Sequence, residues 1–308
     1  MVFNVTILGS NSAVPTLMRN PTAQLLNHNE NYFLIDCAEG TQLQLRRYKF
    51  KLQRIQHIFI SHMHGDHFFG LIGLISTMHL LGRKKPLHVY GPADLKRVID
   101  LQLEVSDTTL CYPFHFHEIP FGESQLIFEN QWLMVSTIPL KHSIPANGFL
   151  FREKTGRRRL KKDVIKEYNL SPEQIFNLKN GEDIQNDNGE TIQNDLLTLP
   201  PHPVRSYAYC SDTARSPEIV PVIRNAGLLY HEATFEHTMA DVAEEKKHST
   251  ARQAAETARD AKVAKLIIGH FSNRYSDPEI LKTEASKVFP ETDLALDGRT
   301  FEIPADRV

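Results

Sequence analysis

Two kinds of segment alternate along the chain, short apolar runs and longer stretches with helical spacing of apolar residues. The short runs are rich in β-branched and aromatic residues, which predicts buried strands. Because strands and helices alternate, we expect a layered α/β fold. The predicted strands are residues 5–8, 32–35, 55–61, 87–90, 124–128, 133–138, 206–210, 228–231 and 266–269, and the predicted helices are 41–48, 68–81, 92–103, 250–263 and 278–288.

The pattern changes over residues 151–203, which we expect to be an exposed insertion in a single domain spanning 1–308. Residues 152–166 hold eight basic and two acidic side chains, and residues 167–195 hold seven acidic side chains and one lysine. Charge runs of this kind are usually solvated surface, so the run alone does not establish a binding site. Gly148 and the Pro200-Pro201 pair are the predicted hinges of the insertion.

Composition bounds the class of protein. The net charge of −2 over 308 residues predicts no general attraction to nucleic acid or membrane, so polyanion binding would need a local patch. Cys37, Cys111 and Cys210 form no C-x-x-C pair, which disfavours a disulfide framework or a thiolate zinc site. The first residues lack the features of a signal peptide, and the longest apolar stretch is too short to span a bilayer. We therefore expect a cytoplasmic protein without membrane contact.

The strongest chemical signal is His62-x-His64-x-Asp66-His67, directly after the predicted strand 55–61. Imidazole and carboxylate groups are ligands of zinc, and a loop leaving a rigid strand would hold them in place. The alternative is an exposed polar loop or a chance histidine cluster. Further motifs follow other strands: Pro139-Leu-Lys-His142, Ser211-Asp212-Thr213, His231-Glu232-Ala-Thr, His248-Ser-Thr250 and Gly269-His270-Phe-Ser272-Asn-Arg274.

This ordered set of motifs resembles the ribonuclease Z family, in its short form, over nearly the whole chain. The resemblance implies the metallo-β-lactamase fold, an αββα sandwich, with an inserted flexible RNA-binding arm. It also implies an endoribonuclease that hydrolyses the phosphodiester after the discriminator base of precursor tRNA, leaving a 3′-hydroxyl on the tRNA and a 5′-phosphate on the trailer. One position that departs from the usual pattern is Ala13, where a glycine is common.

Carried onto this chain, the resemblance implies two zinc ions per subunit. Asp36 would either orient a ligand histidine or cap a turn before the next helix. The residues predicted to hold one ion are His62, His64 and His142; those predicted to hold the other are Asp66, His67 and His270; Asp212 would bridge the two.

The chemistry of phosphodiester cleavage suggests roles for the other motif residues. Asp66 would orient the attacking water and accept its proton, and His248 would protonate the leaving oxygen. Glu232 would keep His248 protonated. Thr250-x-x-Gln253 matches a capping box, so Thr250 is expected to cap a helix whose N-terminus favours phosphate. The predicted phosphate contacts are Thr250, Ser272 and Arg274, and for Arg274 the alternative is a surface ion pair.

The family resemblance favours RNA binding for the basic insertion and implies a homodimer in which the arm of one subunit serves the site of the other. A phosphodiesterase or esterase for small substrates is the nearest alternative, and the arm argues against it. A non-catalytic RNA-binding or scaffold protein would be expected to lack ligands or the proton donor, and none is missing. The arm residues predicted to bind precursor tRNA are Arg157, Arg158, Arg159, Lys161 and Lys162.

Overall fold

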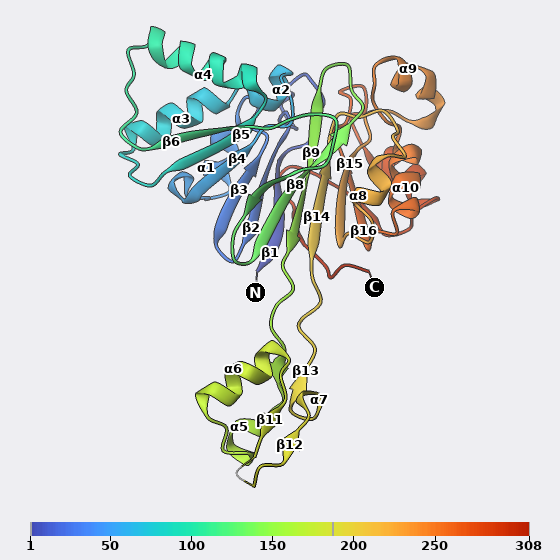
Figure 1. Cartoon of the computed structure of the whole chain (residues 1–308). Coiled ribbons are helices and arrows are strands. Elements are labelled where there is room, and N and C mark those ends of the chain that lie inside the picture. The colour runs from blue at the N-terminus through green and yellow to red at the C-terminus, as the bar shows by residue number, and fades with distance from the viewer. Residues whose placement is uncertain (1, 187, 308) are drawn as a thin grey trace.

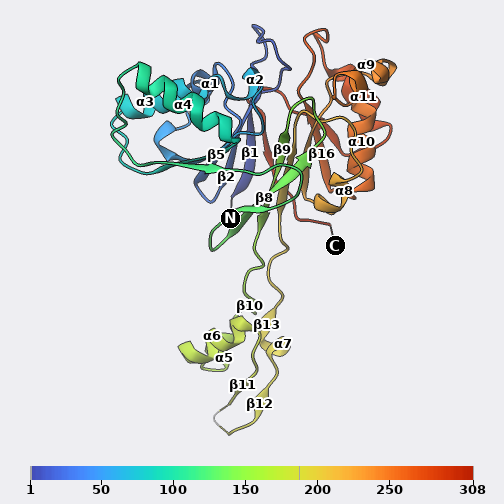
Figure 2. The same cartoon turned by 45° about the horizontal axis from the view of Figure 1, so that its top comes forward.

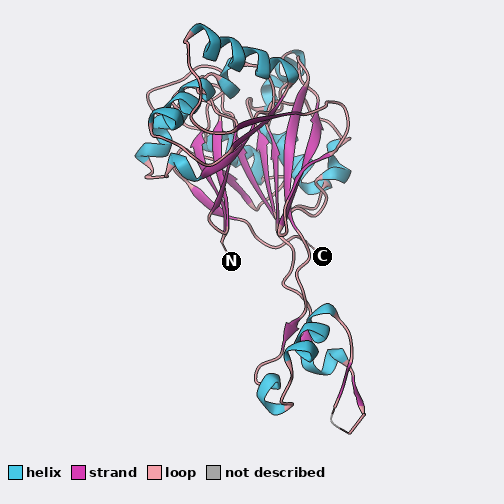
Figure 3. Ribbon diagram, turned by 60° about the vertical axis from the view of Figure 1, so that its left-hand side comes forward, coloured by secondary structure: helices cyan, strands magenta, loops and turns pink. Residues whose placement is uncertain are grey.

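Two seven-stranded sheets pack face to face at the centre of the molecule, with helices on both outer faces (Figures 1 and 3). The computed structural model describes residues 2–186 and 188–307. This αββα arrangement confirms the predicted fold class. In spatial order the first sheet is β18 (Thr300–Glu302), β1 (Phe3–Gly9), β2 (Ala23–His28), β3 (Asn31–Ile35), β4 (Ile55–Phe59), β5 (Leu87–Gly91), β6 (Phe114–Glu118), and the second is β17 (Thr292–Leu294), β16 (Lys265–Gly269), β15 (Leu228–Glu232), β14 (Ser206–Cys210), β9 (Ala146–Glu153), β8 (Leu133–Leu140), β7 (Leu126–Glu129).

Three apolar clusters hold these layers together. Aromatic side chains such as Phe59, Phe149 and Tyr209 fill the space between the sheets. Aliphatic side chains bury the outer face of each sheet under helices, which is the hydrophobic contact that a layered domain needs. Helices α1 (Thr41–Arg47), α2 (Gly65–Phe68), α3 (Leu71–Leu80) and α4 (Ala93–Val105) lie on the first sheet, and α8 (Ile219–Val222), α9 (Ala240–Glu245), α10 (Ala251–Asp260) and α11 (Glu279–Ser286) lie beside the second (Figures 1 and 2).

Most predicted elements are present, but the predicted helix over 68–81 is wrong in one respect. It is divided into α2 and α3 at Gly70, where the backbone passes close to Ala38: a Cβ on Gly70 would lie 2.0 Å from the Ala38 carbonyl oxygen. Two short 3₁₀ turns, η1 (Leu52–Arg54) and η2 (His237–Met239), complete the main body. No described helix is both long and apolar enough to cross a membrane.

The insertion forms a small folded unit that projects from one end of the sandwich on two extended connections (Figures 1 and 2). It has its own apolar cluster around Leu178, and helix α6 begins with a capping box between Ser171 and Gln174. Its elements are β10 (Arg159–Leu160), α5 (Val164–Glu167), α6 (Pro172–Asn180), β11 (Ile184–Gln185), β12 (Thr191–Ile192), α7 (Asn194–Leu197) and β13 (Thr198–Leu199).

The predicted hinge at Gly148 is wrong. Gly148 lies in the middle of β9, a strand that the apolar pattern did not reveal, and it pairs with Ile138 of β8. A Cβ at Gly148 would lie 2.2 Å from the Tyr209 carbonyl oxygen, so the glycine allows close packing of β9 against β14. The chain leaves the sheet after Glu153 and returns at Ser206, with Pro200 and Pro201 in the return connection.

Parallel pairing brings several strand ends to one edge of the molecule. Strands β3, β4 and β5 run parallel in the first sheet, as do β14, β15 and β16 in the second. Strand β8 also shares the direction of β14, because both pair antiparallel with β9. The loops that carry the predicted ligands therefore leave the carboxyl ends of strands that meet at the same edge.

Histidines within the first sheet, on β4 and β5, predict that the stability of the fold falls in acid. The ring of His57 stacks on His88 with a centroid separation of 5.1 Å and packs against Phe128 at 4.6 Å. Burial, followed by the nearby His88, His117 and Arg83, lowers the pKa of His57 to about 3. The unfolded chain, with a pKa of about 6.5, therefore takes up the proton first, and stability is lost as pH falls from about 6.5 towards 3.

We expect this histidine to reduce the free energy of unfolding by about 1–2 kcal/mol between about pH 7.5 and about pH 5. Urea unfolding of the wild type and of His57→Phe at both pH values measures the effect, because phenylalanine keeps the ring contacts but cannot be protonated. The variant should lose less stability on acidification. An equal loss in both proteins would contradict the assignment to His57.

Candidate metal centre

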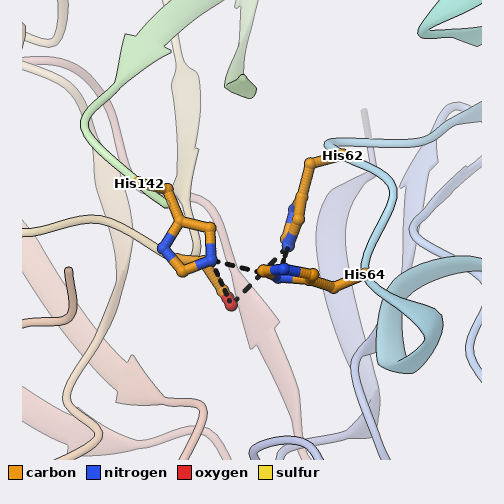
Figure 4. Close-up of side chains that lie close together, drawn as sticks. His62, His64 and His142 are labelled. Atoms are coloured by element: carbon orange, nitrogen blue, oxygen red, sulfur yellow. Dashed lines mark hydrogen bonds and ion pairs between the residues drawn. The ribbon is translucent and has the colours of Figure 1, made fainter. Parts of the chain in front are cut away.

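Three histidine side chains from two loops converge at the edge where the carboxyl ends of the parallel strands meet (Figure 4). His62 and His64 follow β4, and His142 follows β8. The Nδ1 atom of His64 lies 3.1 Å from the Nε2 atom of His62 and 3.1 Å from the Nε2 atom of His142. Asp212, two residues beyond the end of β14, places its Oδ2 atom 3.7 Å from His62 Nε2 and 3.6 Å from His142 Nε2. These four ligand atoms surround one position.

A second group lies on the other side of the Asp212 carboxylate. The Oδ1 atom of Asp212 is 3.3 Å from the Nε2 atom of His67 and 3.2 Å from the Nε2 atom of His270. Asp66 places its Oδ2 atom 3.6 Å from each of the same two nitrogens. Asp212 thus presents one oxygen to each group of possible ligands.

The unpaired atoms and the charges of this centre fit a metal. The Nε2 atoms of His67 and His270 are buried and make no hydrogen bond to any described residue, which is costly for a polar atom. Burial alone would lower the pKa of His67, but the charges of Asp212, Asp36 and Asp66 raise it well above its usual value. Buried carboxylates therefore favour positive charge at this point, and a nitrogen and oxygen ligand set suits zinc.

The opposite nitrogens of the same histidines are held by neighbouring groups, which fixes the orientation of each ring. His67 Nδ1 lies 2.7 Å from Asp36 Oδ2. Asp36 also accepts hydrogen bonds from the Ser61 amide and hydroxyl and from the Tyr209 hydroxyl. The described partners of the Asp36 carboxylate are Ser61, His67 and Tyr209, and none belongs to the turn before α1, which argues against the alternative in which Asp36 caps that turn.

Several groups that orient these histidines, among them Ser61, were not predicted. The His142 Nδ1 atom lies 3.0 Å from the Lys247 carbonyl oxygen, and the Thr234 hydroxyl lies 3.0 Å from His270 Nδ1. Thr234 belongs to the motif that contains Glu232, so its spacing was a usable signal. Tyr209 reaches Asp36 from the opposite sheet, and such a contact leaves no local pattern in the sequence.

The buried Glu232 and the partly buried His248 form a pair beside the centre. Glu232 ends β15 and His248 precedes α10, and the distance between Oε1 and Nδ1 is 2.7 Å. Burial alone would lower the pKa of His248, but the charge and hydrogen bond of Glu232 outweigh it and raise the pKa to about 9. The His248 ring packs against those of His142 and His270, with centroid separations of 5.1 and 5.4 Å. A protonated imidazole is thereby held against the ligand groups.

The arrangement also allows another role for His248. Ligand atoms of Asp212, His248 and His270 lie within 4.8 Å of one another, so His248 could itself approach an ion. His231 belongs to none of these groups. Its Nδ1 atom lies 2.8 Å from the Glu232 carbonyl oxygen, which agrees with a structural role.

The residues predicted to contact phosphate differ in their exposure to solvent. Thr250 caps α10 through the expected capping box with Gln253, but its side chain is buried and its hydroxyl also lies 3.2 Å from His237 Nδ1. This placement engages the Thr250 hydroxyl within the protein and disfavours its predicted contact with a phosphate. Ser272 and Arg274 lie together after His270, with the Arg274 Nε donating to Ser272 Oγ at 3.2 Å, and the Arg274 side chain is exposed.

The loop after β1 contacts the centre through Ala13, whose backbone is strained. The backbone amide of Ala13 donates a hydrogen bond of 2.9 Å to Asp66 Oδ2. Ala13 adopts a φ of 53°, in the left-handed region that glycine enters at lower cost. The glycine expected at this position therefore has a conformational reason, and alanine places the same amide against Asp66 at some strain.

Known proteins with similar sequences include enzymes named ribonuclease Z. The chain is 46% identical to ribonuclease Z of Bacteroides thetaiotaomicron over 301 residues, which cover 98% of this chain and 95% of the relative. It is also 46% identical to ribonuclease Z of Cytophaga hutchinsonii, covering 100% of this chain and 98% of that one. The chain belongs to the ribonuclease Z family.

Solved structures agree with this membership. Human tRNase Z, short form, superposes with a TM-score of 0.71 at 28% identity, covering 98% of this chain and 99% of that one. The metallo-β-lactamase fold protein YhfI from Bacillus subtilis superposes with a TM-score of 0.69 at 16% identity, which shows a shared fold.

Residues 3–202 also match the family model described as Anti-Pycsar protein Apyc1. Glu232, His248 and His270 lie outside that matched range.

The predicted RNA-binding residues of the arm differ in their exposure and in their contacts within the arm. Arg157 and Lys162 are exposed. Arg158 forms an ion pair with Asp195, and Lys161 donates hydrogen bonds to the carbonyl oxygens of Asp195 and Leu196. Arg159 donates to the Pro200 carbonyl oxygen at 3.0 Å. Arg158 and Lys161 therefore help to hold the arm together, whereas Arg157 and Lys162 are free to meet a ligand at the surface.

Proposed function

We propose that this chain is a zinc-dependent endoribonuclease that removes the 3′ trailer from precursor tRNA, leaving a 3′-hydroxyl on the tRNA and a 5′-phosphate on the trailer. The observation that carries the proposal is the Asp212 carboxylate between two ligand groups, beside the Glu232–His248 pair, in a member of the ribonuclease Z family. Phosphodiester hydrolysis needs a nucleophile, compensation of negative charge and a proton for the leaving oxygen, and these groups can supply all three.

Two zinc ions per subunit fit the ligand groups. His62, His64 and His142 would hold one and Asp66, His67 and His270 the other, with Asp212 between them. Zinc bound in such a pair lowers the pKa of bound water and compensates charge on phosphoryl oxygens. Asp66, which accepts the Ala13 amide, would orient the attacking water and accept its proton.

His248 would donate the proton to the 3′-oxygen that leaves. Its Nδ1 atom faces Glu232, so the Nε2 atom is the one available to a substrate. The raised pKa keeps the imidazole protonated at neutral pH. Ser272 and the exposed Arg274 follow His270 and would contact the phosphate beside the scissile bond.

Precursor tRNA would be gripped by the arm through its backbone and shape, as expected for a structured RNA. The arm lies at the opposite end of the sandwich from α2 (Figure 1), the helix that contains Asp66 and begins after His64. That separation supports a homodimer in which the arm of one subunit positions RNA for the site of the other. For such a tRNA-processing role we propose a cytoplasmic location.

Removing the arm separates RNA recognition from chemistry. Residues 156–202 can be replaced by a short Gly-Ser linker, because the Glu153 amide already bonds to the Arg205 carbonyl oxygen at 3.0 Å across β9 and β14. We expect kcat/KM for precursor tRNA to fall about a hundredfold or more, through lost phosphate contacts, with hydrolysis of a small chromogenic phosphodiester retained. Normal cleavage of precursor tRNA by the shortened chain would contradict the proposed role of the arm and favour a small-substrate phosphodiesterase.

Mixing two chains that each cleave precursor tRNA poorly tests the dimer. An arm-deleted chain supplies an intact site, and a His248→Ala chain supplies an intact arm. If each arm serves the partner's site, mixed dimers should recover cleavage of precursor tRNA, while each parent alone stays low. No recovery, with mixed dimers verified by mass, would contradict the exchange of arms.

A further inference from the structure

An open hollow lies where the arm joins the main body. One wall is the loop between β7 and β8, which carries Trp132, the only tryptophan in the sequence. The other wall is the first part of the arm, residues 156–160, with Lys179 of α6. The Trp132 side chain is 53% exposed and also borders an adjoining hollow beside His202 and Pro203. A large aromatic ring therefore stands open to solvent between two parts of the molecule.

Positive side chains line the same hollow as this ring. Five of them line the hollow, and none of its lining residues is acidic. Two of the five are neutralised by ion pairs, Lys154 with Glu129 and Arg158 with Asp195. Among the residues that the structure describes, no carboxylate lies within ion-pair distance of the other three. In a chain with a net charge of −2, such a local excess favours an anionic ligand. The five are Lys154, Arg157, Arg158, Arg159 and Lys179.

An exposed aromatic ring among unneutralised cations matches the chemistry of single-stranded nucleic acid binding. A base stacks on the ring, and the neighbouring phosphates meet the cations. Arg157 presents a second flat surface, since its guanidinium lies 5.0 Å from the centre of the Phe176 ring. A paired base is already stacked within its helix, so the ligand must offer an unpaired nucleotide.

We propose that Trp132 and the hollow beside it bind an unpaired nucleotide of the substrate RNA, with the base on the indole ring and the phosphates on Arg157, Arg159 and Lys179. This inference rests on the proposed function, because it takes the RNA of that function as its ligand. Since one wall belongs to the body and the other to the arm, the bound nucleotide would also fix the direction in which the arm points.

The single tryptophan makes the site directly measurable. A single-stranded oligouridylate of about eight nucleotides, within the usual size of such sites, should quench the fluorescence of Trp132, and added salt should weaken the binding. An RNA duplex of the same length should quench much less. Anisotropy of a labelled precursor tRNA then measures Trp132→Ala, which should bind about five- to a hundredfold more weakly, and Trp132→Phe, which should recover most of the affinity. Leu101→Ala, at an exposed position on α4 away from the hollow, is the matched control.

The outcomes of these measurements separate the two proposals. Circular dichroism verifies the fold of each variant. If wild-type protein cleaved precursor tRNA but Trp132→Ala bound it as tightly as the wild type, the inference would be wrong and the proposed function would stand. The same holds if the oligouridylate left the fluorescence unchanged. If the wild type failed to cleave precursor tRNA while the oligouridylate still quenched Trp132, the proposed function would be wrong and the nucleotide site would stand.

Discussion

Replacement of Asp212 by alanine is expected to lower the rate of precursor tRNA cleavage by about a thousandfold or more. One oxygen of this carboxylate faces His62 and the other faces His67, so its loss affects both ligand groups at once. Loss of several kcal/mol of metal-derived charge stabilisation corresponds to at least that factor in rate. Single-turnover cleavage together with metal analysis by plasma mass spectrometry measures both consequences, and the variant should also bind less metal.

A control for this substitution is Asp306→Asn. Asp306 accepts hydrogen bonds from the Ser206 hydroxyl and the Gly227 amide, at the amino ends of β14 and β15 and so far from the centre. This variant should retain its metal and its rate. If Asp212→Ala bound two ions per chain and cleaved at a normal rate, Asp212 would not be a bridge.

The His248→Ala variant should cleave precursor tRNA about a hundred- to ten-thousandfold more slowly, because the leaving oxygen would lose its proton donor. Its metal content should be unchanged. This second measurement distinguishes a proton donor from a ligand, since Asp212, His248 and His270 lie close enough together for either role. Loss of one ion in His248→Ala would contradict the assignment as proton donor.

The dependence of this step on pH follows from Glu232. Burial lowers the pKa of His248, but the charge of Glu232 has the larger effect and raises this pKa to about 9. The imidazole is therefore protonated below about pH 9, and the single-turnover rate should fall as pH rises through that value. In Glu232→Gln the charge is removed and burial remains, so the falling limb should move to lower pH. The variant should therefore recover activity as the solution is made more acidic. An unchanged profile would show that Glu232 does not control this proton.

The sequence was most informative where function depends on local spacing. The histidines and carboxylates of the centre follow predicted strand ends, and parallel strands carry their ends to one edge, so the grouping could be expected before the structure. The capping box at Thr250 was equally local, and it places His248 two residues before the N-cap of α10.

Features that depend on contacts between distant segments could not be predicted in this way. Gly148 appeared to be a hinge because it precedes the charged segment, yet it is a strand residue that admits the backbone of β14. The arm has few apolar residues, so its small cluster around Leu178 left only a faint pattern. Tyr209 reaches Asp36 across the two sheets, and only the packing of those sheets brings the pair together.

The most direct test of the central claim is restoration of activity to the metal-free protein. Chelation should abolish cleavage of a precursor tRNA with a 3′ trailer. Zinc should then restore cut sites next to the discriminator base, with full activity reached when two ions are bound per chain, as counted by plasma mass spectrometry. Cleavage that persisted at the same position in protein verified to contain no metal would contradict the account.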